Sequence, residues 1–317
     1  MRAILLFVIL INWLPVMLTG QQQQMYTQFM YNKLSLNPAF AGNDPHTCLT
    51  LLYRDQWNGF PGAPKAQLAT LNLPRIGSKI GLGFNFERQS IGISEKITYE
   101  LAYAYKFFFG DGTLSMGMNV SGRNFTQDFT DPRLFAIQDI FMDPSIPQTI
   151  QSRNLLNAGF GVYFNTNNYF IGASLPRMIR NDLDFDTNTF LSTEARHLMV
   201  MGGGSFLVND GLRLTPQVLM RAAENSPFTF DINMSATFDE KYMAGLTYRT
   251  GGAGNDIGES LDIIFSFQIS ERIMLGFAHD ITLSKLRTID NGSLEMILSY
   301  CFIPRRIKTV IVNPRYF

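Results

Sequence analysis

The sequence offers few residues from which a catalytic or metal site could be built. Of its three histidines, His46 precedes the first predicted strand, while His197 and His279 lie on separate predicted strands with no cysteine or pair of carboxylates nearby in the sequence. Zinc sites and nucleophile–base pairs need several such groups brought together. No motif supplies a nucleophile with its base. We therefore predict no catalytic residue, no metal site and no cofactor.

Four aspartates between residues 124 and 152 could hold calcium: Asp128, Asp131, Asp139 and Asp143. Their order and spacing differ from those of an EF-hand loop, and Pro132 and Pro144 suggest plain turns instead. The run 202–204 consists of three glycines, but no helical pattern follows it. It therefore does not fit a phosphate-binding loop and more readily marks a bulge.

Residues 1–20 have the layout of a secretory signal peptide, with Arg2, an apolar stretch and then small residues. A retained membrane helix is the alternative, but Asn12 and Pro15 interrupt an apolar run that would need about 20 residues to span a bilayer. No cysteine lies near the cleavage point, so a lipid anchor there is not indicated. We expect the mature chain to begin near Gln21.

The composition of the mature chain points to a membrane β-barrel. Without Arg2 it holds 26 − 1 = 25 Lys and Arg against 26 Asp and Glu, which argues against a nucleic-acid partner. Charged residues make up 16% and aromatic residues 13%, whereas soluble domains contain about 25% charged residues. No apolar run long enough for a membrane helix follows residue 20. An exported chain of this kind is typical of a transmembrane barrel.

Hydrophobic residues alternate with polar ones over long stretches. In residues 227–238 phenylalanine and other apolar residues occupy every second position, with Thr229, Asp231 and Asn233 between them. A period of two is that of a β-strand with one apolar and one polar face. We predict fourteen such strands: 47–57, 65–73, 79–88, 95–108, 112–123, 153–165, 168–176, 194–207, 210–222, 227–238, 241–250, 257–269, 271–280 and 292–303. The second and eighth alternate poorly.

Long and short connections alternate between these predicted strands. Outer-membrane barrels have an even number of antiparallel strands, short periplasmic turns and longer extracellular loops. The predicted fold class is therefore all-β, a transmembrane antiparallel barrel of 14 strands with both termini periplasmic. The predicted parts are a signal peptide (1–20), a periplasmic N-terminal segment (21–46), an outer-membrane barrel (47–303) and a periplasmic C-terminal tail (304–317).

Eight glycines fall on the inward face of the predicted barrel: Gly81, Gly83, Gly117, Gly159, Gly161, Gly172, Gly245 and Gly276. They could relieve strain where strands bend, or they could let a segment or partner approach the wall closely. Charged residues also face inward, among them Arg54, Asp231 and Glu295. A solvated lumen would account for those charges.

Several motifs resemble one known family. Gln28, Tyr31-Asn32 and the stretch Asn37-Pro38-Ala39-Phe40-Ala41-Gly42 resemble the N-terminal signature of the PorP/SprF family of type IX secretion system outer-membrane proteins. Similar stretches are Tyr53-Arg54-Asp55-Gln56-Trp57, residues 159–164 with 169–176, and the closing NPRYF of 313–317. The resemblance implies a role in export or surface retention of adhesin-like cargo with a C-terminal sorting domain, or in gliding motility. It also implies periplasmic ring components of the system as partners, in addition to outer-membrane lipid.

The N-terminal signature residues are predicted to bind a partner from the periplasmic side: Gln28, Tyr31, Asn32, Asn37, Pro38, Ala39, Phe40, Ala41 and Gly42. Asn37-Pro38 stops regular structure and Ala39 to Gly42 allow close packing. We expect residues 21–46 to be ordered and to fold under or into the barrel mouth, because exposed aromatic residues need a surface. A flexible leader is the alternative. Arg54, Gln56 and Trp57 form the predicted signature of the barrel itself.

The two cysteines, Cys48 and Cys301, lie at opposite ends of the chain but at neighbouring positions of a closed barrel. Both face the lumen by phase, in an oxidising compartment, so they could form a disulfide. Two unpaired small residues are the alternative.

A non-enzymatic secretion component in the cell outer membrane is the preferred function. A small-solute diffusion channel is the first alternative, and an outer-membrane enzyme is another.

Overall fold

The computed structural model describes residues 24–134, 147–183, 193–224, 226, 228–251 and 258–304. The predicted signal peptide, residues 305–317 and two of the four clustered aspartates, Asp139 and Asp143, lie outside these ranges. Among the described residues no helix is long and apolar enough to cross a membrane.

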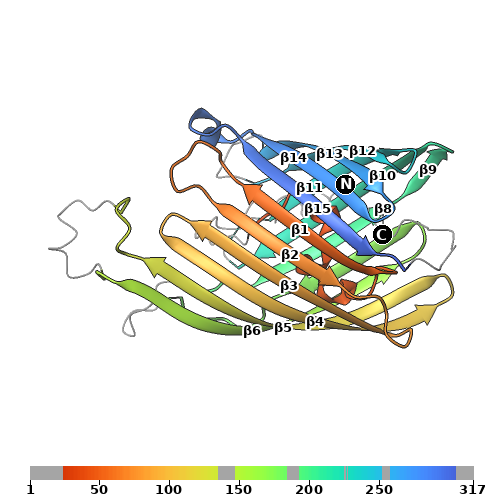
Figure 1. The fold of residues 1–317 in the computed structure, drawn as a ribbon, viewed down its shortest axis with the longest axis horizontal. Helices are drawn as coiled ribbons and strands as arrows, with labels where there is room; N and C mark the ends of the chain where they lie inside the picture. Colours follow the sequence, from red (N-terminus) through yellow and green to blue (C-terminus); the bar gives the residue numbers. More distant parts are fainter. Residues whose placement is uncertain are drawn as a thin grey trace, which may run out of the picture.

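The chain forms one closed, antiparallel β-barrel of fourteen strands, which confirms the predicted all-β barrel and its strand number (Figure 1). The predicted periplasmic location of both termini stays a prediction. The strands β8 and β9 are two parts of one barrel strand, because both pair with β10. The barrel closes where β1 pairs with β15. The strands are β1 Thr47–Asp55, β2 Lys65–Asn72, β3 Ile80–Ile91, β4 Ser94–Phe109, β5 Gly112–Asp128, β6 Ile150–Asn165, β7 Tyr169–Leu175, β8 His197–Gly204, β9 Phe206–Asn209, β10 Leu212–Ala223, β11 Thr229–Phe238, β12 Tyr242–Arg249, β13 Ser260–Ser270, β14 Ile273–Thr282 and β15 Ser293–Phe302.

The predicted faces of the strands agree with the burial of their side chains. In β4 the inward residues Thr98, Glu100 and Lys106 are buried, whereas the outward Tyr99 and Leu101 are 53% and 66% exposed. The polar residues of β11 are likewise buried and its apolar residues exposed. This barrel therefore presents its apolar face outward, as a membrane requires.

The connections differ from the prediction at one place. The β3–β4 connection was expected to be long, but both strands extend until only Gly92 and Ile93 join them, with Gly92 at φ +56°. The hairpin of β5 and β6 also extends further than predicted, and in Figure 1 it projects at the left. The remaining connections keep the predicted order. We call the end with residues 58–64 the long-loop end and the opposite end the short-turn end.

The barrel is joined covalently where it closes. Cys48 and Cys301 are directly paired across β1 and β15 and form a disulfide, with Cα atoms 4.1 Å apart. Arg54 lies opposite Glu295 across the same pair of strands, near its long-loop end. The first and last strands are thus linked at both ends of their contact.

Short helices occupy the interior. They are η1 Phe29–Tyr31, α2 Lys33–Leu36 and η2 Pro38–Phe40, drawn in red within the barrel in Figure 1. A fourth helix, η4 Lys285–Thr288, lies in the connection between β14 and β15. We call residues 24–46 the plug.

Candidate functional site: a plug in the barrel lumen

The plug runs along the lumen from one end of the barrel to the other. At the long-loop end, Gln24 Nε2 donates to Gln56 Oε1, one residue beyond β1, at 3.3 Å. At the short-turn end, the Gly42 amide donates to Oδ1 of Asn72, the last residue of β2, at 2.8 Å. The chain then enters β1 at Thr47. The N-terminal end of the plug therefore lies near the long loops.

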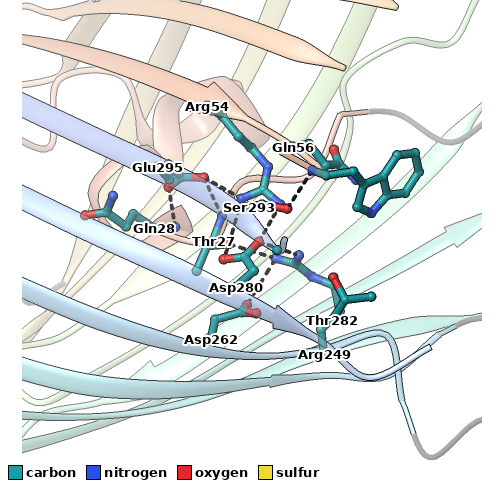
Figure 2. A network of polar contacts seen from close by, with 12 residues as sticks. Thr27, Gln28, Arg54, Gln56, Arg249, Asp262, Asp280, Thr282, Ser293 and Glu295 are labelled. Atoms are coloured by element: carbon teal, nitrogen blue, oxygen red, sulfur yellow. Dashed lines mark hydrogen bonds and ion pairs between the residues drawn. The ribbon is translucent and has the colours of Figure 1, made fainter. Parts of the chain in front are cut away.

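A cluster of buried charges holds this N-terminal end (Figure 2). The amides of Thr27 and Gln28 donate to the two carboxylate oxygens of Glu295 at 2.9 and 2.8 Å. The Thr27 hydroxyl donates to Asp280 at 2.7 Å. Arg54 Nη1 lies 2.9 Å from that hydroxyl and 3.1 Å from Glu295. First strand, last strand and plug therefore meet at one point.

The cluster continues around the wall to β10–β13. Arg249 donates to Asp231 at 3.0 Å and lies 3.6 Å from both Asp262 and Asp280. Arg221 donates to Asp231 at 2.6 Å. Three guanidinium groups (+3) thus face four carboxylates (−4), for a formal charge of −1. Buried charges are costly unless paired and hydrogen-bonded, so the two plug amides that donate to Glu295, together with Arg54, stabilise this carboxylate.

The glycines on the inner wall make room for the plug. A Cβ atom built on Gly81 would lie 2.0 Å from the Ala41 carbonyl oxygen, and one on Gly117 would lie 2.4 Å from the Ala39 nitrogen. Such distances are far below van der Waals contact. Six of the eight inward glycines face the plug. Gly81 and Gly117 meet its backbone, and the other four meet its side chains: Gly83, Gly161, Gly172 and Gly276. Close approach of a segment is therefore the correct interpretation for these six.

An apolar patch on the opposite wall packs on the plug. Phe29, Met30 and Leu34 of the plug are at most 5% exposed. They share one hydrophobic cluster with inward residues of β8, β10, β12 and β13: Met199, Met201, Leu219, Met243 and Ile264. These residues were not predicted from the sequence to be functional. One feature of the sequence could have indicated this patch. The eighth predicted strand alternated poorly because Met199 and Met201 occupy inward positions.

Asn37 and Pro38 of the N-terminal signature determine the backbone conformation of the C-terminal half of the plug. Asn37 Oδ1 accepts the Ala39 amide at 2.9 Å and so caps η2, while its Nδ2 donates to the Val162 carbonyl at 2.9 Å. Pro38 begins η2 without needing an amide partner. The Phe40 ring packs edge-on against Tyr163, with centroids 5.5 Å apart. Asn37 therefore lies between α2 and η2, caps η2 and anchors the plug to β6.

The predicted partner-binding residues lie inside the barrel in this structure. Gln28, Asn37, Ala39 and Ala41 are fully buried, and Phe40 is 8% exposed. Tyr31 shares a hydrogen bond of 2.6 Å with Ser266 on β13. The remaining signature residues Asn32, Pro38 and Gly42 lie within the same segment. Their neighbours are the wall of this chain, so their binding of a partner stays a prediction.

The predicted barrel signature is brought together at the long-loop end. Arg54 is in the charge cluster and Gln56 contacts Gln24. Trp57 adopts φ +52° and its amide donates to Ser293 at 3.2 Å. The contact between the two strands therefore continues two residues beyond the end of β1.

Within the described ranges no group of three or more His, Cys, Asp or Glu side chains could hold a metal ion. His46, His197 and His279 lie before β1, at the start of β8 and in β14. The structure therefore does not bring the three histidines into one site.

Comparison with known proteins gives one family match. The family model described as "Type IX secretion system membrane protein PorP/SprF" matches residues 18–300. No curated protein matches. Among solved structures, the Ralstonia pickettii toluene transporter TbuX is 11% identical, covers 89% of this chain and 95% of its own, and has a TM-score of 0.51. The Acinetobacter baumannii outer membrane protein Omp33 is 9% identical, covers 82% of this chain and 100% of its own, and has a TM-score of 0.45. At such identity the TbuX match shows the fold alone.

Proposed function

Because the chain belongs to the PorP/SprF family of type IX secretion system membrane proteins, we propose that it serves secretion as a closed, non-enzymatic barrel in the outer membrane. The observation that carries this proposal is the plug. Its backbone lies against wall glycines at distances that leave no room even for a methyl group. A folded cargo has no passage through a lumen filled in this way.

The barrel would then act as an anchored platform for other proteins. Adhesin-like cargo with a C-terminal sorting domain and periplasmic ring components are the partners that the family resemblance suggests. In the plugged state these partners would bind at the ends of the barrel, because the N-terminal signature residues are buried. Binding through the signature residues would require the plug to leave the lumen.

A diffusion channel for small solutes is the second candidate. It is favoured by the polar inner face of the wall, such as Thr229, Asn233 and Ser235 on β11. With the plug displaced, these side chains would line a water-filled passage. The two candidates differ in whether the plug leaves the lumen during function.

Changing Phe40→Asp tests the proposal. The substitution removes the ring packed on Tyr163 and buries an unpaired charge, which should weaken plug docking by about 2 kcal/mol or more. We expect cargo export to fall while the barrel still inserts. The matched control is Phe60→Asp, the same change at a ring that is 45% exposed in the β1–β2 loop. Normal export by Phe40→Asp, or equal loss with Phe60→Asp, would contradict the proposal.

A further inference from the structure

The connection after β7 folds into the long-loop mouth of the barrel. Oδ1 of Asn157, an inward residue of β6, accepts the amides of Met178 and Ile179 at 3.0 and 2.9 Å. Asn157 Nδ2 donates to the Ile179 carbonyl at 2.7 Å. Leu183 packs on Phe125 and Leu155, which are buried on β5 and β6. We call residues 176–183 the mouth loop.

Glu194 fixes the mouth loop from the other side. It accepts hydrogen bonds from Asn181 at 3.0 Å and Asn157 at 3.1 Å, and it is paired with Arg123. Burial alone would raise the pKa of Glu194, but Arg123 and Arg177 beside it lower the pKa below its ordinary value of 4.5. Glu194 is therefore an anion at neutral pH, and Arg177 Nε lies 3.7 Å from it.

One carboxylate is shared by the mouth loop and the plug. The Tyr26 hydroxyl, near the N-terminal end of the plug, donates to Glu87 Oε1 on β3 at 2.5 Å. Arg177 Nη2 of the mouth loop lies 3.7 Å from the other oxygen of Glu87. The side chains of Glu87 and Arg177 are 13% and 14% exposed, so solvent screens their attraction only partly.

We propose that Glu87 is a latch that couples the mouth loop to the plug. When the mouth loop is in place, Arg177 keeps the Glu87 carboxylate positioned to accept from Tyr26. When an external ligand draws the loop outward, Glu87 loses this counter-charge, and the N-terminal end of the plug loses one of the contacts that hold it in the lumen. Coupling of this kind is reciprocal, so plug release also frees the loop. The latch rests on the proposed function, since it assumes that the plug closes the lumen.

Ion conductance in planar bilayers tests the latch with two variants that keep side-chain size. Tyr26→Phe removes one hydroxyl from the plug, and Arg177→Met removes the charge from the mouth loop. A hydrogen bond to a charged group commonly changes an equilibrium by about tenfold or more, so Tyr26→Phe should raise the open probability by roughly that factor. Arg177→Met, which removes an ion pair rather than a hydrogen bond, should raise it as well, by a smaller factor. Arg180→Met is the control, because Arg180 lies in the same loop, carries the same charge and pairs with the exposed Glu224 instead.

The double variant Tyr26→Phe/Arg177→Met separates a latch from two independent effects. If both act through Glu87, the double variant should open no more often than the stronger single variant. The latch would be overturned if the double variant raised the open probability by the product of the two single effects. It would also be overturned if Arg180→Met raised the open probability as much as Arg177→Met. A variant lacking residues 24–42 gives the fully open level. If it conducts while Tyr26→Phe and Arg177→Met behave as the wild type, only the latch is wrong. If it stays closed, the proposed function fails as well.

Discussion

At Gly117 the wall of the barrel leaves no room for a side chain. The nearest atoms to a Cβ built there are backbone atoms of Ala39 and Pro38, all within 2.6 Å. Backbone in a packed plug cannot rotate away as a flexible side chain can. Gly122, on the same strand, has its nearest atom at 3.9 Å, at the end of a leucine side chain. The two positions therefore form a matched pair for substitution.

We predict that Gly117→Ala displaces the plug and Gly122→Ala does not. Overpacking of this kind costs about 1–3 kcal/mol. Trypsin reports the displacement, because the plug contains the buried Lys33, which is 3% exposed. Cleavage after Lys33 should appear in solubilised Gly117→Ala and be absent from Gly122→Ala and the wild type. Equal protection of Lys33 in all three proteins would contradict this prediction.

We predict that loss of the buried Arg54 destabilises the barrel more than loss of a charge on its surface. Arg54→Met leaves Asp280 and Glu295 without their closest cation, and removing one partner of a buried ion pair costs about 3–5 kcal/mol. We expect a clear fall in the temperature at which the barrel loses its folded migration on a gel. Adding Glu295→Gln to Arg54→Met should recover part of the loss. A single variant as stable as the wild type would contradict the pairing.

Among the strands, the alternation of apolar and polar residues predicted the structure well, because the outer face of the barrel is apolar and its inner face is mostly polar. β4 and β11 were predicted almost to their ends. The eighth strand was less clear because Met199 and Met201 face inward, where a solvated lumen would favour polar residues. Those two methionines pack on the plug, so the irregularity in the pattern was a consequence of the insertion.

The contacts of the plug could be predicted only in part. The sequence indicated that residues 21–46 would be ordered and that inward glycines could admit a close segment. Which glycine meets which plug residue depends on strand register, since Gly81, Gly117 and Gly161 belong to three different strands. The link from Thr27 to Asp280 joins residues 253 positions apart, and no local pattern marks it. The mouth loop and the Glu87 contact were not predicted.

The disulfide between β1 and β15 closes a loop of 253 residues. Cross-links of this kind contribute about 2–5 kcal/mol. We predict that alkylation of the unreduced, unfolded protein adds no carbamidomethyl group and that alkylation after reduction adds two, as measured by intact mass. Cys48→Ser/Cys301→Ser should lower the unfolding temperature. Two additions without reduction would show that the thiols are free.

At the scale of the whole molecule, the order of short and long connections predicts which end faces the cell surface. Single cysteines in the described parts of the β5–β6 and β7–β8 loops, at Thr130 or Arg180, should react with an impermeant thiol reagent on intact cells. Cysteines at Asn167 or Glu240, in short turns, should react only after the outer membrane is breached. Reversed labelling would mean that the barrel has the opposite orientation.

Single-channel recording shows whether the chain's own N-terminal segment closes the lumen. The wild-type protein reconstituted in a planar bilayer should show no steady ion current. The variant lacking residues 24–42, checked for folded migration on a gel, should show a large steady current, because its lumen is lined by polar side chains. Steady large currents from the wild type, or a folded deletion variant that does not conduct, would contradict closure of the lumen by the plug.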